Sequence, residues 1–220
     1  REGVPALALT NPKPNYGVPE DMLKMLQAYY ASTTFMDAQL GRLLAALERT
    51  GHASNTIIVM IGDHGWHLGE HGLWHKGTLF EESARSPLLI VAPGAKGNGR
   101  SSSRIVEFVD LFPTLADLCG VEAPAGLAGV SLRPLLENPS SSWSRPAFTQ
   151  VQRAGNKMGR SVRTDRWRYT EWDEARAGSE LYDHAADPGE HRNLATDPAL
   201  RGEIATLAHL LRSTMLSSAP

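Results

Sequence analysis

The sequence predicts an α/β unit followed by a smaller α+β unit. A helical pattern over residues 19–49 precedes a short apolar, β-rich run over 56–61, which is the order of a helix followed by a buried strand. After a stretch rich in Ser and Pro at 136–146, the segments become short and partly alternating, which favours a small antiparallel sheet. We therefore assign the two units to residues 1–138 and 146–220.

Local signals delimit the helix predicted over residues 19–49. Pro19 suits the first turn, Glu20 and Asp21 suit the positive end of the helix dipole, and Gly51 is typical of a helix end. The residues at helical spacing are Met22, Leu26, Tyr29, Thr33, Met36, Leu40, Leu43 and Leu47. The residues before this helix, 1–17, are expected to form a loop.

Two apolar runs follow the helix. The run TIIVMI over 56–61 is predicted to be a strand buried on both faces, as in a parallel sheet. The run SPLLIVAPG over 86–94 predicts a second buried strand that ends in a Pro-Gly turn. A helix followed by such strands is typical of an α/β fold.

The stretch VDLFPTLADLCGV over 109–121 predicts a short helix capped by Asp110. Pro113 is tolerated because it lies near the first turn. The inward face of this helix is expected to carry Leu111, Leu115 and Leu118. The single cysteine, Cys119, is expected to be a buried free thiol, because its surroundings in the sequence are apolar.

The second unit is predicted to be four short strands covered by a terminal helix. The strand segments are AFTQVQ (147–152), GRSVRT (159–164), WRYTEW (167–172) and SELYD (179–183). The helix over 197–215 carries its apolar face at Leu200, Ile204, Leu207 and Leu211.

The charge balance excludes some classes of partner. The 220 residues hold 22 Lys and Arg against 24 Asp and Glu, a net charge of −2. This balance gives no reason to expect nucleic acid or a membrane as a partner. Any anion must therefore be bound locally.

The chemistry concentrates in GDHGWHLGEHGLWHKG, residues 62–77, which holds four of the eight histidines. In open α/β sheets, ligands bind beyond the carboxyl ends of the strands, and Asp63 and His64 directly follow the run over 56–61. A metal site would lie at this position, although an Asp and His pair after a strand is also typical of a turn or a helix cap. Lys76, farther along the same segment, is predicted to reach an anionic ester held by the metal.

A zinc hydrolase is the alternative interpretation of the same segment. His67, Glu70 and His71 match the H-x-x-E-H pattern of one class of zinc peptidase. That chemistry needs a helix, whereas glycines stand at positions 65, 69 and 72, and each disfavours a helix by about 1 kcal/mol. A loop is therefore the favoured prediction.

Several segments of the chain carry a family resemblance. IIVMIGDHGWHLGEHGLWHKGTLFEESARSPLLIVAPG, residues 57–94, resembles the second signature region of the formylglycine-dependent sulfatases of the alkaline phosphatase superfamily. The iduronate-2-sulfatase branch is the most similar. AYYASTTFMDAQLGRLLAAL, FVDLFPTLADLCGV, GRSVRTDRWRYTEW and ELYDHAADPGEHRNL resemble, in this order, segments of the carboxyl-terminal half of such sulfatases.

The resemblance implies the roles of particular residues. It makes Asp63 a carboxylate ligand of Ca²⁺, His64 its neighbour in the metal shell, and Lys76 the catalytic lysine that binds the sulfate group. Trp74 and His75 are candidates for further contacts to the substrate, with Trp74 either a packing residue or a platform for a sugar ring. The implied fold is part of a sulfatase-like mixed sheet with helices, ahead of the small α+β unit.

The family nucleophile has no counterpart in the sequence. Formylglycine is made from Cys or Ser in a C/S-x-P-x-R motif, and the 220 residues contain no such motif. We therefore expect the chain to be the carboxyl-terminal portion of a sulfatase, inactive alone, that binds an amino-terminal chain of the same enzyme or self-associates. Family members are often periplasmic, secreted or lysosomal, but residues 1–20 lack a secretory signal pattern, so the compartment stays open.

The implied reaction is hydrolysis of a sulfate ester on a sulfated sugar, such as an iduronate-2-sulfate type substrate of glycosaminoglycan degradation. Two alternatives remain beside the zinc hydrolase. One is a phosphonate or phosphate monoester hydrolase of the same superfamily, which Asp63 and Lys76 would also serve. The other is an inactive remnant that binds anions or another protein.

Overall fold

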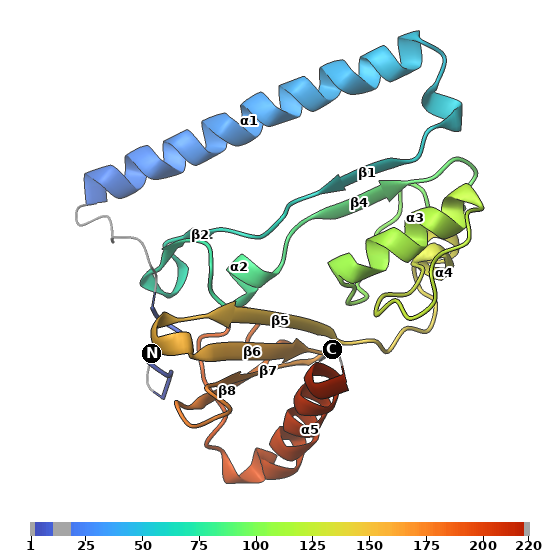
Figure 1. The fold of residues 1–220 in the computed structure, drawn as a ribbon. Helices are drawn as coiled ribbons and strands as arrows, with labels where there is room; N and C mark the ends of the chain where they lie inside the picture. Colours follow the sequence, from blue (N-terminus) through green and yellow to red (C-terminus); the bar gives the residue numbers. More distant parts are fainter. Residues whose placement is uncertain (1–2, 11–18, 218–220) are drawn as a thin grey trace.

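The computed structural model describes residues 3–10 and 19–217, and Figure 1 shows their arrangement. In chain order the elements are α1 (Pro19–Arg49), β1 (Ile58–Ile61), β2 (His67–Leu68), β3 (Trp74–His75), α2 (Glu81–Ala84), β4 (Leu88–Val91), α3 (Leu111–Cys119), α4 (Arg133–Glu137), β5 (Ala147–Gln152), β6 (Met158–Arg163), β7 (Trp167–Trp172), β8 (Ser179–Asp183) and α5 (Arg201–Ser217). Most of the loop predicted over 1–17 lies outside the described residues.

The predicted helix over 19–49 is confirmed as α1, with its two acidic residues in the first turn and Arg49 in the last. Figure 1 shows α1 on the far side of β1 and β4 from the C-terminal sheet. Its apolar side chains are largely exposed: Leu23 is 67% exposed, Phe35 69% and Leu43 66%. Nothing among the described residues buries this face of α1. None of the described helices is both long and apolar enough to cross a membrane.

The strands predicted at 56–61 and 86–94 are confirmed as β1 and β4, but the expected burial of both strands and the parallel character of the first are wrong. β1 and β4 pair antiparallel, with Ile58 opposite Val91 and Ile61 opposite Leu88. The chain doubles back through the glycine-rich segment, whereas parallel neighbours need a crossover connection. Within the described residues these two strands pair only with each other, so Leu89 stays 52% exposed.

The helix predicted at 109–121 is confirmed as α3, preceded by a 3-10 turn over Phe108–Asp110. Asp110 is buried at the N-cap position of α3, but the predicted side-chain cap is wrong: its carboxylate makes no capping bond to α3 and instead accepts the backbone N–H of Glu107, at 2.9 Å. Two further expectations are wrong: Leu115 is 37% exposed, and Cys119 is exposed rather than buried. The buried position of the helix is Thr114, which hydrogen-bonds the backbone of Leu132.

The predicted antiparallel sheet is confirmed, in the order β5-β6-β7-β8. Helix α5 covers one face and forms a core with it, made of Val162, Trp167, Tyr169, Leu181, Leu207, Ala208 and Leu211. Figure 1 shows α5 on the side of the sheet that faces away from α2.

The other face of the same sheet packs against the glycine-rich segment and the residues that follow it. Leu73, Leu79 and Phe80 form a second core with Trp172 and Tyr182 of the sheet. Every residue of β7 is therefore buried, because each face of this central strand is covered. The boundary predicted between 138 and 146 stays a prediction.

Candidate active site

The structure brings together the three site residues that the sequence singled out. The Nζ of Lys76 lies 2.8 Å from the Nε2 of His64, and the Oδ2 of Asp63 lies 3.3 Å from the same nitrogen. The His64 Nδ1 lies 2.8 Å from the carbonyl oxygen of Gly65. A carbonyl can only accept, so the hydrogen-bond network places a proton on Nδ1 and leaves Nε2 as an acceptor.

This arrangement is suited to bind charge at the surface. The Asp63 carboxylate is 85% exposed and the His64 ring 28%, so both can be reached from solvent. In this structure the Lys76 ammonium donates to the His64 nitrogen, the position where a metal ion would also bind. The site therefore pairs two potential metal ligands with a cation that can move toward an anionic group.

Close backbone packing explains the glycine at position 65. Its N–H donates to the carbonyl oxygen of Ser83 at 2.9 Å, and a Cβ on Gly65 would lie 2.0 Å from the carbonyl oxygen of Glu82. Any side chain would force the two segments apart. Gly77, next to Lys76, has φ +92, a conformation that side chains disfavour.

The segment between His64 and Lys76 folds as a small hairpin. β2 and β3 pair antiparallel, with His67 opposite His75. His67 is fully buried, and its Nε2 lies 2.7 Å from the Oγ1 of Thr78. Burial lowers the pKa of His67 below its ordinary value, so the ring is neutral near pH 7. His67 of the first hairpin strand thus ties the hairpin to the residues that directly follow it.

The structure does not form the zinc constellation. His67 lies in β2, and His71 has φ 54 within a 3-10 turn, so the helix that the motif needs is absent from this described segment. Glu70 accepts the backbone N–H of Leu68 at 2.6 Å, and the His71 ring stacks on Phe80 at 4.0 Å. The pattern H-x-x-E-H is therefore a coincidence of sequence.

The two candidate substrate contacts differ in exposure. Trp74 is only 4% exposed, so in this structure it packs inside the protein, and a role as a sugar platform is not supported. His75 is half-buried, and its ring lies edge-on to that of Trp66, with 5.2 Å between the ring centroids. Trp66 in turn stacks on His64 at 6.2 Å. Trp66 thus packs between the hairpin and the candidate metal ligand.

Sequence reasoning missed a buried polar cluster formed by Arg168, Glu190, His184 and Glu81. Arg168 of β7 is only 3% exposed. Its Nε lies 2.5 Å from the Oε1 of Glu190, and its Nη2 pairs with Glu81. The available signal was ELYDHAADPGEHRNL, in which a histidine and a glutamate flank an Asp-Pro-Gly turn.

Asp63 and His64 fit part of a calcium site. Ca²⁺ takes six to eight ligands, mostly oxygens, and these two residues supply one carboxylate and one ring nitrogen. Across residues 3–10 and 19–217, the one group of three or more potential ligands is Glu81, His184 and Glu190, away from this pair. Asp63 and His64 would therefore need further oxygen ligands.

Family models match both parts of the chain. The model described as "Sulfatase" matches residues 8–121. The model described as "N-sulphoglucosamine sulphohydrolase, C-terminal" matches residues 69–216.

Individual relatives agree with these models. Mouse iduronate 2-sulfatase is 33% identical, over 96% of this chain and 50% of its own length. A protein solved in complex with its substrate, D-glucosamine-2-N,6-O-disulfate, is 35% identical with a TM-score of 0.79, over 86% of this chain and 40% of that one. The phosphonate monoester hydrolase of Agrobacterium radiobacter is 30% identical with a TM-score of 0.80, over 91% and 43%. The chain spans 36% and 32% of two other curated sulfatases it matches.

Proposed function

The chain belongs to the sulfatase family, and we propose that it supplies part of an active site that hydrolyses sulfate esters of sugars. The observation that carries this proposal is the convergence of Asp63, His64 and Lys76 at one exposed point. In the proposal Lys76 binds the sulfate group, and Asp63 and His64 hold a calcium ion.

Lys76 suits the sulfate role because of its charge and its reach. An ammonium group offers three donors, which can hydrogen-bond sulfate oxygens as negative charge develops on them. The His64 nitrogen that accepts from Lys76 would bind a cation instead once the metal site is filled. Lys76 would then be free to turn to the sulfate group.

Asp63 and His64 suit the metal role because of their protonation. The Asp63 carboxylate is largely exposed, and the His64 Nε2 carries a lone pair, as a ligand must. A bound calcium ion would supply positive charge beside the sulfate oxygens. Asp63→Asn is expected to weaken calcium binding, measured by calorimetry on the active enzyme. Full calcium affinity after this change would exclude Asp63 as a ligand.

The substrate class follows from the relatives. One neighbour binds a glucosamine disulfate as its substrate, and other relatives are named as sulfatases of iduronate and of N-acetylglucosamine. We therefore propose a sulfated saccharide, of the kind found in glycosaminoglycans, as the substrate of this protein. Glucosamine and iduronate sulfates should be compared directly.

A phosphonate monoester is the second candidate substrate, since one structural neighbour hydrolyses that ester. The deciding experiment measures turnover of an aryl sulfate and of an aryl phosphonate ester by the same enzyme preparation, with and without a calcium chelator. We expect faster hydrolysis of the sulfate, lost with the chelator. A higher kcat/KM for the phosphonate would reverse the assignment.

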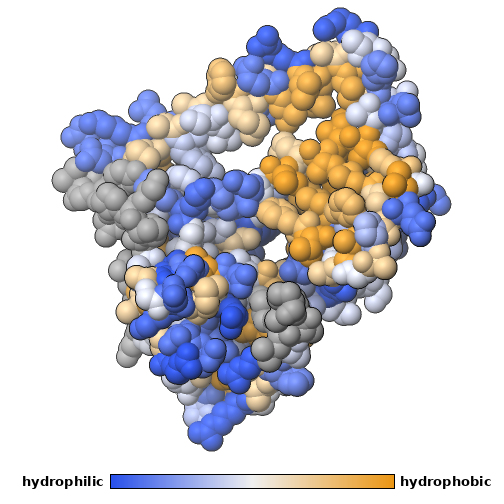
Figure 2. All heavy atoms as spheres, in the orientation of Figure 1, coloured by the Kyte–Doolittle hydropathy of each residue, from blue (hydrophilic) through white to orange (hydrophobic). Residues whose placement is uncertain are grey.

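The nucleophile must come from outside the 220 residues, because they contain no C/S-x-P-x-R motif. Figure 2 shows hydrophobic residues gathered on one face, over α3 and the neighbouring strands. Leu89, Val109 and Phe112 are each at least half exposed there. We propose that this face binds another part of the same sulfatase, with self-association as the competing outcome. The solution mass of residues 1–220, with and without that part, distinguishes them.

A further inference from the structure

The short helix α2 holds both ends of the segment that carries the candidate active site. Gly65, next to His64, donates its N–H to the Ser83 carbonyl at 2.9 Å. Gly77, next to Lys76, donates its N–H to the Ser83 Oγ at 3.0 Å, and Thr78 does the same at 3.2 Å. The carbonyl and the hydroxyl of Ser83 thus hold the two ends of the segment, so the position of α2 sets the distance between His64 and Lys76.

Helix α2 cannot maintain this position by itself. It has four residues, Glu81–Ala84, which is a single helical turn and unstable without outside contacts. Phe80 occupies its N-cap position and carries no polar side-chain atom to accept the first backbone N–H groups. The missing acceptor must therefore come from elsewhere in the chain.

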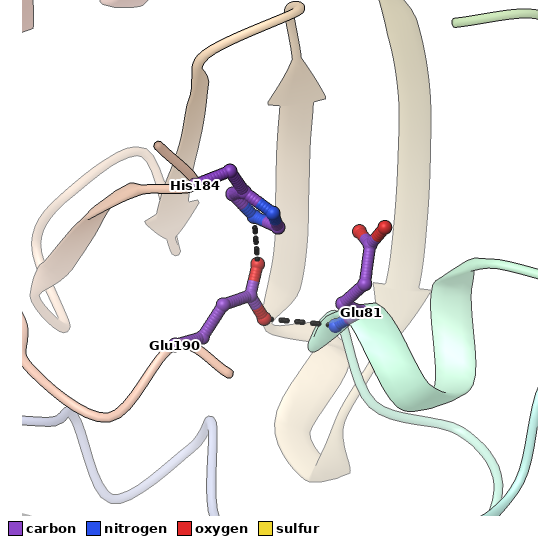
Figure 3. A group of neighbouring side chains, drawn as sticks. All are labelled: Glu81, His184 and Glu190. Atoms are coloured by element: carbon purple, nitrogen blue, oxygen red, sulfur yellow. Dashed lines mark hydrogen bonds and ion pairs between the residues drawn. The ribbon is translucent and has the colours of Figure 1, made fainter. Parts of the chain in front are cut away.

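Glu190 supplies that acceptor from 109 residues farther along. The backbone N–H of Glu81 donates to the Oε2 of Glu190 at 2.8 Å, as Figure 3 shows. The other oxygen, Oε1, accepts from Arg168 and from the His184 Nε2, the latter at 2.8 Å. Glu190 is 1% exposed, so these contacts replace the water that its carboxylate loses.

The charge of Glu190 is retained inside the protein. Burial acts to raise its pKa, but the Arg168 charge and the donors from His184 and Glu81 together hold the pKa below its ordinary value. Glu81, His184 and Glu190 also lie close enough together to bind a metal ion. The Arg168 guanidinium already pairs with both carboxylates, so this is a buried ion network rather than a metal centre.

We propose that Glu190, fixed by Arg168 and His184, is a positioning residue that caps α2 and thereby sets the spacing between His64 and Lys76. This role in catalysis rests on the proposed sulfatase function. The physical link runs from the C-terminal sheet through Glu190 to α2, and from Ser83 to the two ends of the active-site segment.

The test compares two buried carboxylates of the second unit. Glu190→Gln weakens the cap on α2, whereas Glu171→Gln removes a charge that pairs with Arg212 of α5. Glu171 is 5% exposed, and its carboxylate accepts hydrogen bonds from Arg212 and Tyr169 rather than from α2, so it is a matched control. In the 220-residue chain, Glu190→Gln should raise amide hydrogen exchange at Gly65 and Gly77 about tenfold or more, whereas Glu171→Gln should leave it unchanged.

A second variant guards against general destabilisation, since removing one member of a buried ion pair is costly. Glu190→Asp keeps the negative charge near Arg168 but withdraws the acceptor from the Glu81 N–H. It should raise exchange at Glu81, Gly65 and Gly77 while leaving the amides of α5 unchanged. The ¹⁵N signal of the His64 Nε2 should shift in the same variant, because its contact with Lys76 loosens.

Equal exchange at Gly65 and Gly77 in Glu190→Asp and Glu171→Gln would overturn the proposal. In the active enzyme, kcat/KM for an aryl sulfate should fall about tenfold or more in Glu190→Asp and stay unchanged in Glu171→Gln. An unchanged kcat/KM in both would also overturn the role in catalysis. If the parent enzyme hydrolysed no sulfate ester, the proposed function would fail, while the exchange comparison would still decide whether Glu190 positions the segment.

Discussion

The C-terminal sheet and the active-site segment are stabilised in different ways. The sheet β5–β8 has apolar cores on both faces, one with α5 and one with residues 73–80. Within the segment 62–77, Leu73 and Trp74 are buried, whereas the two ends beside His64 and Lys76 are held by individual hydrogen bonds to Ser83. The sheet is thus stabilised by apolar packing on both faces, whereas the reactive side chains are positioned by a few hydrogen bonds to α2.

A third region, α1 with β1 and β4, lacks such support within the described residues. Its apolar side chains are largely exposed, whereas those of the sheet are buried. Figure 2 shows part of the exposed apolar surface of this region. The same type of residue therefore has a different energetic role in the two regions.

The largest effect is expected from truncating the core under α5. Leu211 is 1% exposed, and Leu211→Ala should lower the free energy of unfolding by about 2–5 kcal/mol, since it removes packed volume. The matched change on the exposed helix, Leu43→Ala, should cost less than about 0.5 kcal/mol. Urea unfolding of the 220-residue chain measures both. Similar costs would mean that the face of α1 is covered in solution.

Lys76→Ala should reduce sulfate-ester turnover by the active enzyme about 10²-fold, by analogy with the loss of one transition-state donor. Its stability should hardly change, because Lys76 lies at the surface. Lys96→Ala, an exposed lysine of another loop, is the matched control and should leave turnover as it was. An unchanged rate with a small aryl sulfate would remove Lys76 from the reaction.

Acid should loosen the active-site segment before the sheet. Burial depresses the pKa of His67 in the folded protein, so its stabilising effect is complete above the ordinary histidine pKa of about 6.5 and declines as the pH falls below it. His71 lowers this pKa further, whereas Glu82, Glu70 and Glu190 raise it. Amide exchange at Thr78, corrected for intrinsic rates, should therefore rise toward pH 5.5, as a growing fraction of the His67 rings becomes charged.

His67→Gln provides the control for this pH dependence, because glutamine does not titrate near neutral pH. In that variant, amide exchange of the active-site segment relative to that of the sheet should be the same at neutral pH and at pH 5.5. A pH dependence that persists without His67 would assign the effect to another group.

The smallest change tests the predicted boundary between the units. Brief proteolysis should first cleave the chain near 140–146 or in the loop at 94–103, because exposed loops with small polar residues are the preferred sites. Mass spectrometry of the first fragments identifies the cut. First cleavage inside 19–49 would show that α1 is the least stable element, and the boundary prediction would lose its support.

The local elements follow from short-range patterns in the sequence. Helical spacing predicted α1 and α5, and short alternating segments predicted β5 to β8, because these patterns depend on neighbours a few residues apart. It also indicated Asp63, His64 and Lys76, since position after an apolar run and a family resemblance both pointed to them. The structure brings these three side chains within hydrogen-bond or ion-pair distance.

Only the tertiary structure decided which side chains are buried and how distant strands pair. The antiparallel pairing of β1 with β4, the burial of Trp74 and the exposure of Cys119 all depend on what lies across the fold. The network around Arg168 is the strongest case, because Glu190 meets the backbone of Glu81 across 109 positions of sequence. No local pattern encodes that contact, because burying each charge is costly unless the fold brings its partner into the same buried site.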